Sequence, residues 1–256
     1  MILTVDVGNT NITLGGFEGE NKVFSTRLAT DSRRTSDQYA AEIYHIMRMS
    51  GCTETDISGC IICSVVPETG SALKTAFLKL TGKEPMMLGP GIKTGINIKI
   101  DNPSQLGADL VAGAAGVLGK YPAPCIIIDM GTATTISVMD KEGAFLGGAI
   151  AAGLGLTLKA LAENTAQLPL VDIKAPERVI GTNTSECMQS GLVFGTAAMI
   201  DGLISRMETE IGSPCTVVAT GGRAAEIIPH CTKKITLDKD LLLNGLLNIY
   251  NKNSEK

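Results

Sequence analysis

The pattern of apolar and polar positions divides the chain into two similar series of predicted elements. Each series opens with three short β-prone runs joined by tight turns and continues with alternating helices and buried strands. In the first half we expect strands at 2–5, 12–17 and 22–27, a helix at 35–49, a strand at 59–66, a helix at 71–80 and a strand after Pro85. The helix at 35–49 places Tyr39, Ile43 and Ile46 on one face, which is the spacing of an amphipathic helix.

The second half repeats this order after a bridging helix expected at 106–120. Its expected elements are strands at 123–129, 134–140 and 144–150, helices at 154–162 and 184–210, a strand at 216–220, a helix after Gly222, a strand near Ile235 and a closing helix at 240–251. No low-complexity linker separates the halves, and 256 residues suffice for two cores. The chain is therefore predicted to contain two copies of one α/β architecture.

Composition narrows the classes of function. With 44% hydrophobic and 19% charged residues, the chain has the composition of an ordinary globular protein. Its formal net charge of −4 and the lack of a basic stripe give no reason to expect a nucleic-acid partner. No uninterrupted apolar run of about 18 residues predicts a membrane span, and the first strand begins too early for a signal peptide. We therefore expect a cytoplasmic protein, with no membrane partner.

The seven cysteines lie mostly in apolar runs. Cys60 and Cys63 have the spacing of half a redox or zinc motif, but no second pair follows them. We expect reduced cysteines in a packed core.

Two short stretches carry nearly the same sequence 123 positions apart. The first reads Asp-Val-Gly-Asn-Thr-Asn from Asp6, and the second reads Asp-Met-Gly-Thr-Ala-Thr-Thr from Asp129. A carboxylate at a strand end can hold Mg²⁺, and the N–H groups from Gly8 to Asn11 can donate to phosphate oxygens. A single turn of this kind is usually an ordinary hairpin. Its repetition favours a metal-bound phosphate site formed by two facing turns.

Two further motifs lie at the ends of predicted helices. Gly221 and Gly222 separate a buried strand from a helix, which allows adenine or ribose to approach the backbone closely. Asp109 ends a Gly-Ala-Asp motif in the first turn of the bridging helix. Its carboxylate either complements the helix dipole or acts as a general base for a hydroxyl attacking a γ-phosphate.

These motifs, in this order, resemble those of the type III pantothenate kinases, members of the acetate kinase/sugar kinase/Hsp70/actin superfamily. The resemblance covers nearly the whole chain and also includes 64–67, 91–95, 102–103, 147–150, 183–184 and 189–191. It implies two duplicated ribonuclease-H-like lobes with an interlobe cleft, each lobe having a mixed five-stranded sheet flanked by helices. The expected domains are an N-terminal actin-like ATPase lobe at 1–115 and a C-terminal one at 116–256.

The resemblance implies ATP-dependent phosphorylation of pantothenate to 4'-phosphopantothenate, the first step of coenzyme A biosynthesis. Asp109 would accept the hydroxyl proton, Asp6 would lie near Mg²⁺, and Asp129 would bind a monovalent cation, K⁺ or NH₄⁺. The residues expected to contact ATP are Asp6, Val7, Gly8, Asn9, Thr10, Asn11, Ile12, Thr13, Thr132, Gly221 and Gly222. The residues expected to contact the substrate are Gly107, Ala108, Asp109, Leu110 and Thr184. A homodimer is also implied.

Three positions depart from the family pattern. Leu110 occupies the position at which the family usually has an Arg that contacts the substrate. Ile100 lies where the family usually has a substrate-contacting Tyr, and Ala152 occupies the position of a usual Pro. Loss of a charge-assisted hydrogen bond of about 1.5–3 kcal/mol would weaken binding about ten- to several-hundredfold. The cations that could compensate for the missing Arg are Arg27, Arg33, Lys99 and Arg223.

The departures leave two alternatives to a pantothenate kinase. One is a related kinase for another small hydroxylated substrate, and the other is a non-catalytic nucleotide-binding paralogue that acts through a partner. The retention of Asp6, Asp109 and Asp129 favours catalysis over the paralogue.

Overall fold

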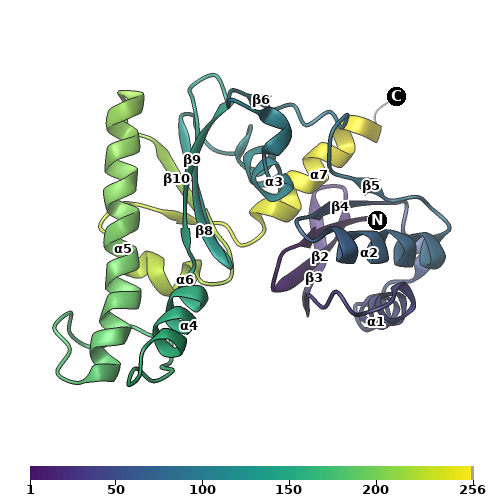
Figure 1. The fold of residues 1–256 in the computed structure, drawn as a ribbon. Helices are drawn as coiled ribbons and strands as arrows, with labels where there is room; N and C mark the ends of the chain where they lie inside the picture. Colours follow the sequence, from purple (N-terminus) through teal and green to yellow (C-terminus); the bar gives the residue numbers. More distant parts are fainter. Residues whose placement is uncertain (255–256) are drawn as a thin grey trace. The chain divides into compact units, whose positions relative to one another are not determined.

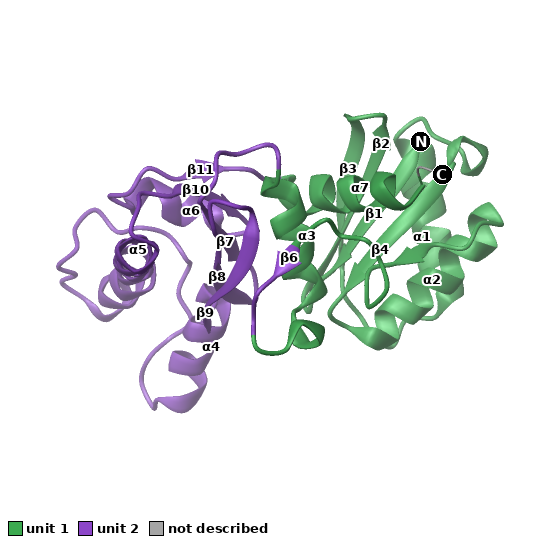
Figure 2. Cartoon of the chain, turned by 90° about the horizontal axis from the view of Figure 1, so that it is seen from above, with its two compact units in different colours: residues 1–96, 101–118, 240–256 green, residues 97–100, 119–239 purple. Residues whose placement is uncertain are grey.

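The computed structural model describes residues 1–254, and the chain divides into two compact units (Figure 2). Unit 1 contains Met1–Ile96, Asp101–Leu118 and the segment that begins at Asp240, and unit 2 contains Asn97–Ile100 and Gly119–Lys239. The units differ from the predicted domains 1–115 and 116–256 in two places. The closing helix belongs to unit 1 because it packs on that unit's sheet, and a short segment near residue 97 adds a strand to unit 2.

Unit 1 is built on a mixed five-stranded sheet. Its strands are β1 (Ile2–Val7), β2 (Asn11–Glu18), β3 (Asn21–Ala29), β4 (Gly59–Ser64) and β5 (Met86–Met87), in the order β3-β2-β1-β4-β5. The first three strands are antiparallel, whereas β4 runs parallel to β1 and to β5. Its helices are α1 (Ser36–Met49), α2 (Pro67–Thr81), α3 (Ala108–Val117) and α7 (Leu241–Ser254), with short 3₁₀ turns at Glu54–Asp56 and Pro103–Gln105.

The two faces of this sheet are covered by different helices (Figure 1). Leu3, Val5 and Val7 of β1 belong to one buried cluster with α1 and α2. Ile2 packs instead with Phe17 and with leucines of α7. Because successive side chains of a strand point to opposite faces, Asp6 lies on the α7 face of the sheet.

Helix α3 is held tightly against α7. A β-carbon at Gly245 of α7 would collide with the carbonyl oxygen of Ala112, so glycine is required for this close approach. The Asn248 side chain donates to the carbonyl of Ala115 at 3.0 Å. Every residue from Val111 to Val117 is buried. The first turn of α3 is therefore supported by a fixed helix pair.

Unit 2 repeats the five-strand order and adds a sixth strand. Its strands are β6 (Asn97–Ile98), β7 (Cys125–Met130), β8 (Ala133–Met139), β9 (Ala144–Ala152), β10 (Thr216–Thr220) and β11 (Thr236–Leu237), in the order β11-β10-β7-β8-β9-β6. Strands β7 to β11 pair as β1 to β5 do, with the same parallel and antiparallel directions. The predicted duplication and mixed α/β fold are confirmed, although the second sheet has six strands rather than five because β6 pairs with β9.

The helices of unit 2 are α4 (Leu154–Asn164), α5 (Thr184–Ile211) and α6 (Ala224–Ile227), followed by a 3₁₀ turn at Ile228–His230. Val193, Ala197, Ile200 and Ile204 of α5 share a buried cluster with one face of β7. Helix α5 is long and apolar enough to cross a membrane, but 44% of its most apolar 18-residue stretch is buried within the protein. Core helices of soluble proteins pass the same test, so α5 is weak support for a membrane span.

Candidate active site

The first repeated motif forms the hairpin between β1 and β2. Asp6 lies inside β1 rather than after it, opposite Thr13 on β2. The Gly8 N–H donates to the carbonyl of Asn11 at 3.0 Å and closes the turn. Thr30, at the end of β3, braces the loop, since its hydroxyl donates to the Gly8 carbonyl at 2.7 Å and its N–H donates to the Thr10 carbonyl at 3.0 Å. The predicted phosphate-binding residues thus form one fixed loop.

The Gly-Ala-Asp motif forms the start of α3. Gly107 is the N-cap, with no side-chain cap, and Ala108 to Leu110 make the first turn. One carboxylate oxygen of Asp109 accepts from the Leu110 N–H at 2.9 Å. Asp109 is half-buried at the positive end of the helix dipole, where a carboxylate is stabilised.

Cys63 is a buried residue on which the charges of both Asp6 and Asp109 act. Its side chain is 0% exposed, and it pairs with Asp6 across the parallel β1–β4 ladder. Burial raises the pKa of the Cys63 thiol, and the negative charges of Asp6 and Asp109 and a hydrogen bond with Asp6 raise this pKa further. Two carboxylates around one buried group repel each other, which favours a cation beside them.

From the sequence, Cys63 is predicted only as a core residue. All seven cysteines lie in the described part of the chain and are free, as expected. The register of β1 and β4 is what indicates that Cys63 lies beside Asp6, because equivalent positions on adjacent parallel strands lie side by side on one face of a sheet.

The second repeated motif forms the hairpin between β7 and β8 in unit 2. Asp129 lies inside β7, opposite Thr135 on β8 and beside Thr220 on β10. Gly221 has φ +94°, and a β-carbon there would lie 2.5 Å from Oδ1 of Asp129 and 2.5 Å from the Met130 nitrogen. Only glycine fits this position, so the end of β10 lies directly on the motif carboxylate.

The remaining predicted contacts of unit 2 surround this point or follow it in the chain. Gly222 is exposed, and the predicted helix after it is the four-residue α6. The Gly153 N–H, at the N-cap of α4, donates to the carbonyl of Thr132 at 3.0 Å. Thr184 is exposed as the first residue of α5, next to the long loop that follows α4 (Figure 1). Its contact with a substrate stays a prediction.

Three of the four candidate cations have carboxylate partners. Arg33 pairs with Asp31 at 3.1 Å, Lys99 with Asp140 at 2.9 Å, and Arg223 with Glu226 at 2.9 Å. Arg27 lies opposite Thr13 in the β2–β3 ladder, and Thr13 lies opposite Asp6. Cross-strand partners share a face, so Arg27 is exposed on the sheet face that carries Asp6.

The side chains around Asp6 suit a metal ion that is bound partly by the protein and partly by the phosphate groups of a bound nucleotide. Within residues 1–254, no group of three or more His, Cys, Asp or Glu side chains could enclose a metal ion. Mg²⁺ is usually bound by one or two carboxylates, with phosphate oxygens and waters completing its shell. The single carboxylate of Asp6 beside a phosphate-type loop fits that arrangement.

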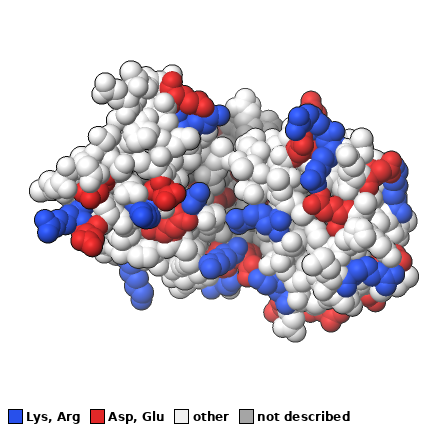
Figure 3. Space-filling model, turned by 90° about the horizontal axis from the view of Figure 1, so that it is seen from below, with Lys and Arg blue, Asp and Glu red and all other residues white. Residues whose placement is uncertain are grey.

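In the view of Figure 3, acidic and basic side chains are interspersed.

Comparison with known proteins identifies the family. A family model described as type III pantothenate kinase matches residues 2–206. The chain belongs to the type III pantothenate kinase family.

The similarity extends over whole chains. The type III pantothenate kinase of Bifidobacterium animalis subsp. lactis (strain AD011) is 42% identical over 253 residues, which are 99% of this chain and 100% of that protein. The protein of the same name from Moorella thermoacetica (strain ATCC 39073 / JCM 9320) is 39% identical over 254 residues, again 99% and 100% of the two chains. A crystal structure of the ROK hexokinase from Thermus thermophilus aligns with a TM-score of 0.52 at 14% identity, covering 100% of this chain and 99% of that one. That likeness supports the two-lobed kinase-type fold.

Proposed function

We propose that the chain transfers the γ-phosphoryl group of ATP to the primary hydroxyl of pantothenate, giving 4'-phosphopantothenate for coenzyme A biosynthesis. The observation that carries the proposal is the full-length similarity to type III pantothenate kinases, in a chain that keeps Asp6 on β1 and Asp109 at the start of α3. The same similarity makes a kinase for another substrate, or a non-catalytic paralogue, less favoured.

In this proposal unit 1 supplies the reacting carboxylates. Asp109 orients the hydroxyl of pantothenate and accepts its proton, while the N–H groups of Asn9, Thr10 and Asn11 hold phosphate oxygens. Asp6 would be among the ligands of Mg²⁺, which would neutralise phosphate charge when bound. The helix pair α3–α7 keeps the Asp109 backbone fixed, so that little reorganisation is needed during the transfer.

Unit 2 holds the nucleotide and a second cation in this proposal. Asp129 binds K⁺ or NH₄⁺, and Thr132 contacts ATP. Gly221 and Gly222 form a surface without side chains against which the adenosine lies. The support is the packing of Gly221 on the Asp129 carboxylate, which leaves backbone rather than side chain at the end of β10.

Arg27 is the cation that we propose in place of the Arg missing at Leu110. It lies on the face of unit 1 that carries Asp6, whereas the other three candidates already pair with carboxylates. Guanidinium groups bind carboxylates and phosphates through parallel hydrogen bonds, which Leu110 lacks.

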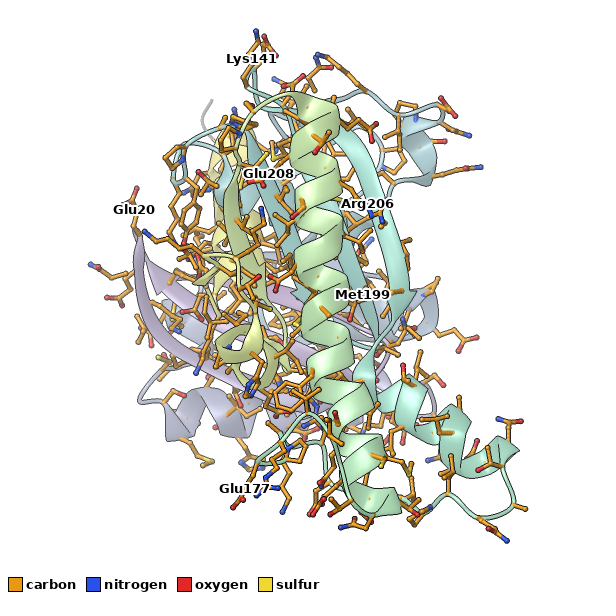
Figure 4. The ribbon with its side chains drawn as sticks, turned by 90° about the vertical axis from the view of Figure 1, so that its left-hand side faces the viewer. Glu20, Lys141, Glu177, Met199, Arg206 and Glu208 are labelled. Atoms are coloured by element: carbon orange, nitrogen blue, oxygen red, sulfur yellow. The ribbon has the colours of Figure 1, made fainter. Side chains whose placement is uncertain are left out.

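We also propose a cytoplasmic homodimer that contacts through unit 2. Figure 4 shows α5 from its outer side, and the exposed positions along it include Gly191, Gly195, Ala198 and Gly202. Small residues at this spacing allow two helices to approach closely. Several large apolar side chains of the unit are also exposed, namely Ile150, Leu170, Val179 and Ile180. A Gly195→Glu variant that sediments as a monomer, beside a dimeric parent, would support this interface, and an unchanged dimer would exclude it.

The central test is an assay of ATP consumption that depends on added pantothenate. We expect ADP formation with pantothenate, stimulation by K⁺ over Na⁺, and loss of this stimulation in Asp129→Asn. Leu110→Arg should be measured beside the parent. A steep rise in pantothenate turnover in Leu110→Arg, with little turnover in the parent, would show that the native substrate is a different hydroxylated compound.

A further inference from the structure

The buried thiol of Cys63 is the nearest polar group to Asp6 on the neighbouring parallel strand. Cys63 and Asp6 are register partners in the β1–β4 ladder, and the Cys63 side chain is fully buried. Adjacent strands lie about 4.8 Å apart, so register partners on one face are within hydrogen-bonding reach. The charge of the Asp6 carboxylate and its capacity to accept a hydrogen bond both raise the pKa of the Cys63 thiol.

We propose that Cys63 is a positioning residue for Asp6. Its S–H donates to one oxygen of the Asp6 carboxylate and thereby fixes the rotamer that presents the remaining lone pairs to Mg²⁺. A partly buried carboxylate needs such donors, and one donor leaves most of its acceptor sites available. The inference depends on the metal role of Asp6 in the proposed function, but it does not depend on which hydroxylated compound is phosphorylated.

The duplicated fold repeats this arrangement. In unit 2 the register partner of Asp129 on the parallel strand β10 is Thr220, which is 3% exposed and also carries a small donor. Both motif carboxylates thus have a buried Cys or Thr beside them on the parallel strand. A residue that only filled space could equally be Val or Ala.

The same strand provides a matched control. Cys60 is also buried on β4, but it lies on the opposite face, in the apolar cluster with α1 and α2. Cys60→Ala removes the same atoms from an equally packed site without touching Asp6. Cys63→Ser keeps a donor at nearly the same volume, whereas Cys63→Ala removes it.

The experiment is calorimetric titration of Mg-ATP into the parent and the variants without any acceptor substrate. We expect Cys63→Ala to weaken Mg-ATP binding about fivefold or more, Cys63→Ser to stay within about twofold, and Cys60→Ala to bind as the parent does. Equal weakening by Cys60→Ala and Cys63→Ala would overturn the inference, because it would reduce the effect to packing. Parent-like binding by Cys63→Ala would overturn it too.

A thermodynamic cycle with Asp6→Asn tests whether Cys63 acts through Asp6. In the Asp6→Asn background we expect Cys63→Ala to add less than about twofold weakening, because the group that it positions is gone. Additive losses would overturn the inference, as would an Asp6→Asn variant that binds Mg-ATP normally. Failure of pantothenate as an acceptor would reject the proposed substrate but would leave this binding cycle readable.

Discussion

The two units share one strand order but differ in what lies beside the repeated hairpin. In unit 1, Asp6 has the buried thiol of Cys63 beside it on β4, and the charge of Asp109, at the start of α3, acts on the same thiol. In unit 2, the corresponding carboxylate, Asp129, is covered by the glycine that ends β10. The two units therefore keep the same hairpin while its neighbours differ. In the proposed function, the neighbours in unit 1 serve proton transfer, and the bare backbone in unit 2 receives the adenosine.

The strongest test of this contrast is Asp109→Asn. If Asp109 is the base that distinguishes unit 1, turnover with pantothenate should fall about 10²–10⁴-fold, while the melting temperature stays near that of the parent. The matched control is Asp37→Asn, since Asp37 also lies in the first turn of a unit 1 helix. Undiminished turnover in Asp109→Asn, measured by steady-state kinetics, would remove the proposed difference between the units.

The glycine contact of unit 2 is tested by Gly221→Ala. The new methyl group must adopt an unfavourable φ and also displace Asp129 and Met130, which should cost about 3 kcal/mol of unfolding free energy. Thermal unfolding should fall by roughly 6–12 °C, with loss of ATP binding.

Gly212→Ala is the control for backbone strain alone. Gly212 has φ +78° at the end of α5, and a β-carbon there would meet nothing within 4 Å. We expect a loss of about 1–2 kcal/mol and normal ATP binding. Equal effects of the two substitutions would show that the close contact in unit 2 is unimportant.

Arg27→Ala examines whether unit 1 also recognises the anionic part of the substrates. We expect the KM for pantothenate or ATP to rise about tenfold with little change in kcat, since one charge-assisted hydrogen bond is lost. Arg33→Ala should leave both KM values unchanged, because Arg33 is 89% exposed beside Asp31. A parent-like KM in Arg27→Ala would assign recognition to another group.

The smallest expected effect concerns the support of α5 in unit 2. Glu208 accepts from the Lys233 ammonium at 2.8 Å and from the Cys215 N–H at 3.1 Å, and these bonds lower its pKa. A lowered pKa in the folded state adds stability above the unfolded-state value of 4.5, and this stability is lost as the pH falls through the folded-state pKa.

Glu208→Gln should therefore lower the unfolding free energy by about 0.5–1 kcal/mol at neutral pH. In urea unfolding, this difference should shrink steadily as the pH is lowered below 4.5. Glu210→Gln, at an exposed position further along the same helix, is the matched control. A difference that grew on acidification would contradict the assigned role of Glu208.

The sequence predicted the local elements better than their partners. The alternation and glycine-ended helices located both meanders and the repeated hairpins within a few residues. The pattern did not reveal that α7 completes unit 1, because an apolar helix face does not indicate which sheet it covers. Strand β6 was missed because two residues carry no periodicity.

The candidate site was predictable in its chemistry but not in its contacts. Asp6, Asp109 and Asp129 could be named from the sequence because motif and spacing are local properties, and their roles stay predictions. Cys63 was missed because its importance comes from its register with Asp6, which depends on a parallel pairing between distant segments. The requirement for glycine at position 221 could not be predicted from the sequence, because it depends on where Asp129 lies in the folded unit.

The placement of α7 also has a consequence for synthesis on the ribosome. The sheet of unit 1 is translated first, yet the helix that covers Ile2 and Phe17 emerges only after all of unit 2 has been made. Once residue 239 has been added, unit 2 has every segment of its own core, whereas the earlier unit displays an uncovered apolar surface until α7 follows. The nascent chain therefore completes its later half before its earlier one, and the uncovered surface is where chaperones would bind.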